Sequence, residues 1–138
     1  MLTAFVDGAC RVSNPGQTSC SWVLYEDDTE VCTGGHYLGP ELHSNNYAEF
    51  MGLLHLLYHL AYNKLRRVTI VSDSKLVVDG TNQAMTITKP DIKGFATEAY
   101  GLLVKGGHKL EHTKGHEGNK GNERADQLCN EILDRAGF

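Results

Sequence analysis

The first third of the chain alternates between apolar and polar positions, which is the period of a β-strand. The alternation predicts strands over residues 2–7, 19–25 and 30–38. Residues 10–17 contain the sequence Asn-Pro-Gly and predict a turn between the first two strands. Three successive strands joined by short turns indicate an antiparallel meander.

Apolar residues spaced three and four apart then replace the alternation and predict helices. Such stripes predict a long helix over residues 45–63, with Ser44 as its N-cap, and a last helix over residues 122–136. Between them the pattern predicts a strand over residues 67–71, a short helix over 74–79, a helix that ends near Lys105 and a strand over 109–113. This order predicts a single α/β domain over residues 1–138, with a mixed five-stranded sheet flanked by helices. The last two strands should run parallel to the first.

Composition limits the class of protein. With 41% apolar and 22% charged residues, the 138-residue chain is expected to fold as a globular protein. No apolar run approaches the roughly 20 residues that a bilayer span needs, so we expect a cytoplasmic protein without membrane contact. The four cysteines show no C-x-x-C spacing, which predicts free thiols in a reducing compartment rather than a zinc site.

Four acidic residues occupy positions where surface acids are uncommon. Asp7 and Asp73 are predicted to end the first and fourth strands, and the ends of neighbouring parallel strands lie side by side. Glu49 is in line with the leucines of the long helix and should face the sheet. Asp126 lies in the first turns of the last helix, at the edge of its apolar stripe. Any one of them alone is better explained as a carboxylate satisfied by backbone N–H groups or a helix dipole.

Together, however, the four acids predict a metal centre. Converging carboxylates repel one another and raise one another's pKa values, and a divalent cation removes that penalty. Hard oxygen ligands suit Mg²⁺ or Mn²⁺, and two such ions about 4 Å apart align a water for attack on a phosphodiester. The net charge of −4 argues against binding nucleic acid mainly through a basic surface, but metal ions can bind the phosphates instead.

The sequences around these acids resemble the four motifs of the type 1 ribonuclease H family, in the family's order. The motifs are FVDGAC at residues 5–10 with NPG at 14–16, NNYAE at 45–49, VSDS at 71–74, and KGHEG at 114–118 followed by NERAD at 122–126. The resemblance covers essentially the whole chain and implies the ribonuclease H-like fold. It also implies an endoribonuclease that hydrolyses the RNA strand of RNA–DNA hybrids with two Mg²⁺ ions, for which Mn²⁺ substitutes. The products would carry 5′-phosphate and 3′-hydroxyl ends.

The resemblance further implies catalytic roles for the matched residues. The two ions would be held by the carboxylates of Asp7, Glu49, Asp73 and Asp126. His116 would assist proton transfer or release of the cleaved phosphate, from a glycine-rich loop that we expect to include Gly121.

Contacts to the hybrid are implied in the same way. Asn14, Asn45 and Asn46 would contact its minor groove, where a 2′-OH distinguishes RNA from DNA. Ser44, where the family often has Thr, would reach a DNA phosphate. A structural interpretation stays open for two of them: Ser44 is equally well a plain helix cap, and Asn14 a turn residue before Pro15.

The chain departs from the family in two respects. Many bacterial members carry a basic, Trp-rich protrusion between the third and fourth motifs, whereas residues 79–105 contain no Trp and only three lysines. We also expect the chain to lack the family's separate hybrid-binding domain. Both absences predict weak, poorly processive binding of the hybrid, helped by a protein partner, for a chain that we otherwise expect to be a monomer.

Two other functions stay open. Exonucleases, resolvases and transposases share this kind of sheet, although their acid spacing and motif contexts differ. A non-catalytic nucleic-acid- or protein-binding module would normally have lost one of the acids.

One further metal-ligand spacing occurs in the sequence. His55 and His59 are four residues apart on the long helix, a spacing that can hold Zn²⁺. They lie opposite the leucine stripe without a third ligand nearby, so we expect two exposed side chains. His36 has no partner that the sequence identifies.

Overall fold

A mixed five-stranded sheet forms the centre of the computed structural model, which describes residues 1–114 and 119–138. The strands are β1 (Leu2–Arg11), β2 (Gln17–Glu26), β3 (Thr29–Tyr37), β4 (Thr69–Ser72) and β5 (Lys109–His112). They lie in the order β3-β2-β1-β4-β5. β1, β2 and β3 pair as an antiparallel meander, and β4 and β5 run parallel to β1. The predicted α/β class and strand directions are therefore confirmed.

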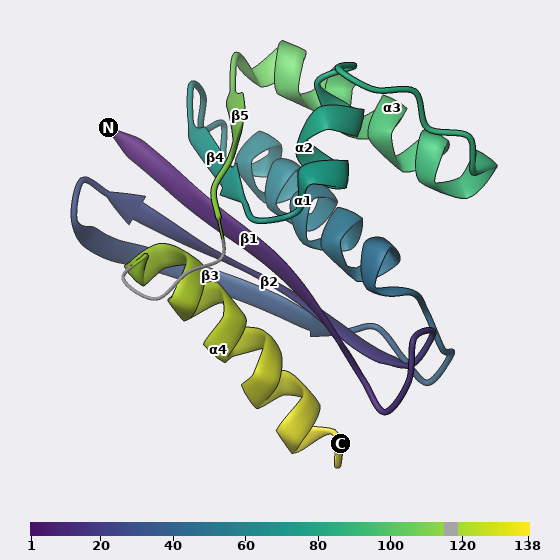
Figure 1. Ribbon diagram of the computed structural model, residues 1–138. Helices are drawn as coiled ribbons and strands as arrows, with labels where there is room; N and C mark the ends of the chain where they lie inside the picture. The colour runs from purple at the N-terminus through teal and green to yellow at the C-terminus, as the bar shows by residue number, and fades with distance from the viewer. Residues whose placement is uncertain (115–118) are drawn as a thin grey trace.

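The described residues also form helices on both sides of this sheet (Figure 1). They are α1 (Asn45–Tyr62), α2 (Lys75–Thr81), α3 (Pro90–Gly106) and α4 (Lys120–Arg135). α1 packs on β1 and β2 from one side, with α3 against α1, and α4 packs on the same two strands from the other side. None of these helices is long and apolar enough to cross a membrane.

The leucine stripe of α1 is buried on the sheet, as its spacing predicts, at Leu53, Leu56 and Leu60. Removing each such side chain from water stabilises the fold by roughly 1.5–3 kcal/mol. Ser44 caps this helix, and its Oγ accepts a hydrogen bond from the backbone N–H of Tyr47 at 3.1 Å. The apolar stripe and the cap together fix where α1 begins and which of its faces meets the sheet.

Two glycines bring the start of α1 very close to β1. A Cβ atom on Gly8 would lie 2.5 Å from backbone atoms of Ala48 and Glu49. A Cβ atom on Gly52 would lie 2.7 Å from the carbonyl oxygen of Asp7. Neither position has room for a side chain. The close approach carries Glu49 up to β1, beside Asp7.

β1 is longer than the alternation predicts, so Asp7 does not end it. The strand continues to Arg11, because β2 pairs with it over its whole length. Pairing with β4, in contrast, stops at Val6 opposite Ser72. The predicted turn at residues 10–17 accordingly shrinks, and Cys10 lies in the strand. Asp7 therefore lies at the end of the β1–β4 pairing rather than at the end of the strand.

α4 begins earlier than predicted, at Lys120. Its N-cap is Asn119, whose side chain accepts a hydrogen bond from the backbone N–H of Asn122 at 3.0 Å. Gly121 is consequently a helix residue and not part of the preceding loop. A Cβ atom at that position would lie 2.1 Å from the ring of Phe5, so the glycine allows close packing of α4 on β1.

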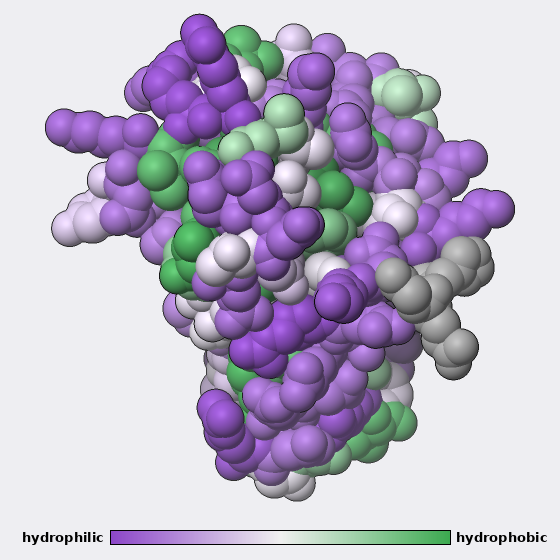
Figure 2. All heavy atoms as spheres, turned by 90° about the vertical axis from the view of Figure 1, so that its left-hand side faces the viewer, coloured by the Kyte–Doolittle hydropathy of each residue, from purple (hydrophilic) through white to green (hydrophobic). Residues whose placement is uncertain are grey.

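The surface seen from the left of Figure 1 is mostly hydrophilic (Figure 2). Apolar side chains on that face gather only in small groups. All four cysteines are free, with Cys20 and Cys129 buried and Cys10 and Cys32 half-buried, as their spacing predicts.

Candidate active site

Two of the predicted acids come from neighbouring parallel strands. Val6 of β1 pairs with Ser72 of β4, so the next residue along each strand, Asp7 and Asp73, lies at the same level of the sheet. Asp73 directly follows the last residue of β4. The end of a parallel pair thus places two carboxylates side by side, as the sequence predicts.

Glu49 of α1 completes a group of three carboxylates, which we call the acid cluster. Asp7, Glu49 and Asp73 each offer a carboxylate oxygen, and these oxygens lie within 4.8 Å of one another. Asp7 is only 4% exposed and Glu49 only 6%, whereas Asp73 is half-buried. The cluster therefore has a closed end at β1 and α1 and an open end at β4.

Burial and mutual repulsion raise the pKa values of these carboxylates. Burial, and then the charge of Asp73, raises the pKa of Asp7 to about 8, although the backbone N–H of Gly8 donates to its Oδ1 at 2.9 Å. Burial, followed by the charge of Asp7, raises the pKa of Glu49 well above its ordinary value. Burial also raises the pKa of Asp73. Without a cation the cluster cannot carry its full negative charge at neutral pH.

A buried carboxylate oxygen without a hydrogen-bond partner indicates that the cluster fits a metal ion. Oε2 of Glu49 is buried and has no hydrogen-bond partner among the described residues. A buried carboxylate oxygen without a partner is costly, and a divalent cation would satisfy it and neutralise its neighbours. A donor set of carboxylate oxygens alone suits hard cations such as Mg²⁺ or Mn²⁺.

The fourth predicted acid, Asp126, lies at the rim and outside this group. It is exposed on α4 and is not within the 4.8 Å set. Its charge nevertheless raises the pKa values of Asp7 and Asp73, so it faces the same space. The expectation that all four acids meet thus holds for three of them.

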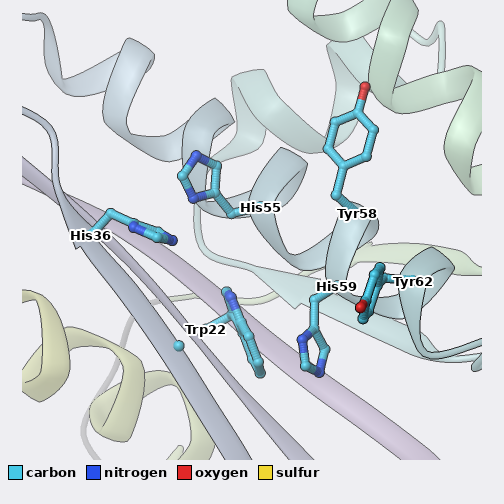
Figure 3. Close-up of a pocket in the computed structure, with 7 residues that line it drawn as sticks. Trp22, His36, His55, Tyr58, His59 and Tyr62 are labelled. Atoms are coloured by element: carbon cyan, nitrogen blue, oxygen red, sulfur yellow. The ribbon is translucent and has the colours of Figure 1, made fainter.

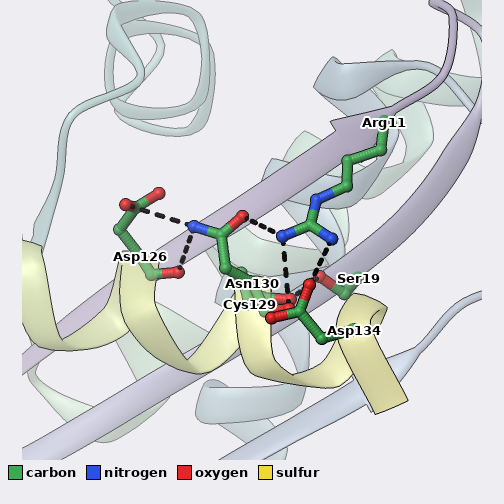
Figure 4. Close-up of polar contacts among 6 residues, drawn as sticks. All are labelled: Arg11, Ser19, Asp126, Cys129, Asn130 and Asp134. Carbon is green, nitrogen blue, oxygen red and sulfur yellow. Dashed lines mark hydrogen bonds and ion pairs between the residues drawn. The ribbon is translucent and has the colours of Figure 1, made fainter. Parts of the chain in front are cut away.

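Asp126 is held from its own helix by Asn130 (Figure 4). The amide nitrogen of Asn130 donates to the backbone oxygen of Asp126 at 3.0 Å and to its Oδ2 at 3.4 Å.

His116, predicted to act in catalysis, lies outside the described residues.

The residues predicted to contact nucleic acid gather at the start of α1. Oδ1 of Asn14 accepts a hydrogen bond from the backbone N–H of Asn45 at 3.0 Å, and Ser44 caps the helix. Ser44 therefore has the capping role that the sequence left open, whereas Asn14 bonds to the first residue of α1. Asn14, Asn45 and Asn46 are exposed, and Glu49 lies one turn further along α1.

One residue of the site was not singled out from the sequence. Asn122 of α4 is 7% exposed, and its side-chain hydrogen bond lowers the pKa of Asp73, opposing the effect of burial. It lies four residues before Asp126, and so on the same side of the helix. Its spacing of four residues from Asp126 is the sequence feature that could have identified Asn122 as part of the site.

The histidines of α1 are not exposed as predicted, because they form part of a groove against the sheet (Figure 3). This histidine groove, of about 480 Å³, is lined by Trp22, Gly34, His36, His55, Tyr58, His59 and Tyr62. The ring of His59 lies 4.4 Å from that of Trp22, and the ring of His36 lies 4.3 Å from that of His55. Contacts between β3 and α1 thus give His36 the partner that the sequence does not identify.

The histidine groove does not gather ligands as the acid cluster does. Sγ of Cys32 lies 3.7 Å from Nε2 of His59. Among the described residues, however, the acid cluster is the one group in which three metal-ligand atoms converge.

Comparison with known proteins gives consistent matches. The family model for RNase H matches residues 1–133. The ribonuclease H of Verminephrobacter eiseniae (strain EF01-2) is 33% identical over 147 residues, covering 96% of this chain and 90% of that protein. RNase H1 from the halophilic archaeon Halobacterium salinarum NRC-1 is similar in structure, with a TM-score of 0.85 and 32% identity over 97% of this chain and 98% of that one. LC11-RNase H1, solved in complex with an RNA/DNA hybrid, shares the fold over the whole of both chains, with a TM-score of 0.86 and 23% identity.

Proposed function

This chain belongs to the ribonuclease H family, and from that premise we propose that it is a metal-dependent endoribonuclease that hydrolyses the RNA strand of RNA–DNA hybrids. The observation that carries the proposal is the acid cluster, with three carboxylate oxygens within 4.8 Å of one another. The complex of LC11-RNase H1 with an RNA/DNA hybrid supports the choice of substrate.

The acids would hold the cations. Asp7, Glu49 and Asp73 would ligate Mg²⁺ directly, and Asp126 at the rim would complete the ligand set for a second ion; Mn²⁺ has the same ligand preference. When bound, such ions supply an activated water and stabilise the charge that develops on the phosphate. Attack of water on phosphorus with departure of the 3′ oxygen leaves a 5′-phosphate on one fragment and a 3′-hydroxyl on the other.

The surrounding residues hold the acids in place and favour their charged forms. The backbone N–H of Gly8 donates to Oδ1 of Asp7 at 2.9 Å, which fixes that carboxylate. Asn122 likewise bonds to Asp73, and this hydrogen bond favours the charged form of that carboxylate. These neutral donors orient the carboxylates without competing for them as a cation from Lys or Arg would.

We assign the exposed asparagines at the start of α1 to substrate binding. Asn14, Asn45 and Asn46 form one polar surface, since the first two are hydrogen-bonded to each other. Amide groups there can reach the 2′-hydroxyls and base edges of the minor groove. Ser44 would add a phosphate contact, and His116 would assist proton transfer at the cleaved bond. With a net charge of −4 the chain would bind the hybrid weakly, and a basic partner would strengthen binding.

The test is a comparison of four labelled substrates: an RNA–DNA hybrid, single-stranded RNA, double-stranded RNA and double-stranded DNA. Each is incubated with Mg²⁺, with Mn²⁺ or with chelator. Cleavage confined to the RNA of the hybrid, and dependent on metal, is expected, with 5′-phosphate and 3′-hydroxyl ends. An Asp28→Asn variant, in which an exposed acid distant from the cluster is neutralised, is the matched control for charge. Cleavage of DNA would favour another nuclease of this fold, and cleavage of nothing would favour a binding module.

A further inference from the structure

A chain of polar contacts connects Asp126 to the end of β1 (Figure 4). One guanidinium nitrogen of Arg11 donates to Oδ1 of Asn130 at 2.8 Å and to its backbone oxygen at 3.3 Å. The other donates to Oδ1 of Asp134 at 2.6 Å. The amide nitrogen of Asn130 in turn donates to the backbone oxygen and to Oδ2 of Asp126. The contacts join two elements, β1 and α4, that lie far apart in the sequence.

Arg11 determines which way the amide of Asn130 points. A guanidinium group can only donate hydrogen bonds, so it must face the oxygen of the amide. The two N–H groups of Asn130 are thereby directed at Asp126, one toward its backbone oxygen and one toward Oδ2. Without Arg11, a flipped amide would present its oxygen to the carboxylate, and the two would repel.

The arrangement holds Asp126 without neutralising it. A basic side chain at position 130 would pair with the carboxylate directly and compete with a metal ion for it. Here the positive charge of Arg11 is one residue further away and is paired with Asp134. Among the described contacts of the Asp126 side chain only a neutral amide touches it, and this amide restrains one of its oxygens.

We propose that Asn130, oriented by Arg11, is a positioning residue that prepares the Asp126 carboxylate for a divalent cation. The inference rests on the proposed function. Because Asp126 is exposed and outside the acid cluster, nothing else among the described contacts restrains its side chain. Groups that orient metal ligands typically change metal affinity by tenfold or more when they are removed.

The test compares Asn130→Ala with Gln127→Ala. Gln127 lies on the same helix and also donates an amide hydrogen bond to a carboxylate four residues away, that of Glu131 at 3.0 Å, so it is a matched control. Two quantities are measured: binding of Mn²⁺ alone to the protein, by the loss of its electron paramagnetic resonance signal, and the Mg²⁺ concentration that gives half-maximal hydrolysis. Asn130→Ala should raise the half-saturating concentration in at least one assay by about tenfold, with an unchanged melting temperature. Gln127→Ala should change neither.

Two outcomes would overturn the inference: no rise for Asn130→Ala in either assay, or an equal rise for Gln127→Ala. Arg11→Ala should raise the same concentration by less, and the double variant should match Asn130→Ala alone, because Arg11 acts through the amide. Additive effects would refute the orienting role of Arg11. If the wild-type chain cleaves no hybrid, the Mn²⁺ measurement still decides the positioning role, and only the proposed function fails.

Discussion

The two ends of α1 hold two clusters of titratable side chains, and among the described residues only one of them gathers three potential metal ligands. Near the start of the helix, Glu49 meets Asp7 and Asp73, and all three carboxylates have raised pKa values. Further along, His55 and His59 meet the sheet across the histidine groove. There, burial and the neighbouring His36 lower the pKa of His55.

The two clusters differ in whether their polar groups have partners. In the acid cluster, three carboxyl groups converge and a buried oxygen of Glu49 lacks a partner among the described residues. In the histidine groove, the rings pack in pairs, His36 with His55 and Trp22 with His59. Ring packing satisfies such pairs, whereas converging carboxylates need a cation to be charged together. Residue type alone would have marked both regions as metal sites.

The largest expected effect is loss of activity when one acid of the cluster is neutralised. Asp7→Asn and Asp73→Asn should each lower hydrolysis of the hybrid by at least about 10³-fold, because the remaining acids cannot hold the cations in place. Without metal, both variants should be as stable as the wild type or more so, since a repelling charge is gone. Activity assays and thermal unfolding in chelator measure the two effects. Retained activity in either variant would remove that acid from the mechanism.

The position of three of the acids follows from local patterns that a sequence displays. Asp73 comes directly after an apolar run, and Glu49 is in line with Leu53 and Leu56, so strand and helix periods suffice to place them. The pairing of Asp7 with Asp73 also follows, because parallel strands end at the same edge. Local patterns therefore predict most of the fold and the closed end of the site.

What the sequence does not display is decided by contacts between distant elements. β1 runs on past Asp7 because β2 continues to pair with it, and no local pattern reports the length of a partner strand. Gly121 lies inside α4, where its missing side chain lets the helix pack closely on Phe5, a contact that the sequence does not reveal. The exposure of Asp126 depends on the rotation of α4 about its axis relative to the sheet. The packing of His36 on His55 depends on how β3 is placed against α1.

His116 offers a sharper comparison between histidines. Replacement by Ala should slow hydrolysis by about 10²-fold without eliminating it, because proton transfer by a side chain contributes on that scale. His55→Ala, in the histidine groove, is the matched control and should leave the rate unchanged. Single-turnover rates on the hybrid measure the difference. Equal rates for His116→Ala and the wild type would make that residue a spectator.

The charge in the acid cluster also predicts how stability depends on pH in the absence of metal. The pKa of Asp7 is raised from 3.8 to about 8 in the folded state, so folding takes up a proton there. The stability that this protonation contributes is fully present below pH 3.8 and is lost as the pH rises toward about 8. At a fixed concentration, Mg²⁺ should therefore stabilise the chain more as the pH rises toward about 8. Where that concentration is a hundred times the apparent Kd, the gain is about 2.7 kcal/mol.

Thermal unfolding across this pH range, with and without Mg²⁺, provides the measurement. Asp7→Asn serves as the reference, because the difference between it and the wild type isolates the contribution of Asp7 from that of every other titrating group. A metal-free wild type whose stability relative to Asp7→Asn did not change with pH would contradict the assignment of a raised pKa.

The smallest effect should come from the histidine groove, where we expect changes in stability but none in catalysis. His59→Ala removes ring packing on Trp22, a contact worth about 0.5–1.5 kcal/mol, and should lower the free energy of unfolding by that amount. His59→Phe keeps an aromatic ring and should recover most of the loss, although it cannot contact Cys32 as an imidazole does.

Trp22 is the only Trp of the chain, so its fluorescence reports directly on this groove during unfolding. Because no third metal ligand converges at the groove among the residues that the structure describes, the Mg²⁺ dependence of hydrolysis should be the same in both variants and the wild type. A changed Mg²⁺ requirement would show that the two ends of α1 are coupled, and the contrast between the acid cluster and the histidine groove would fail.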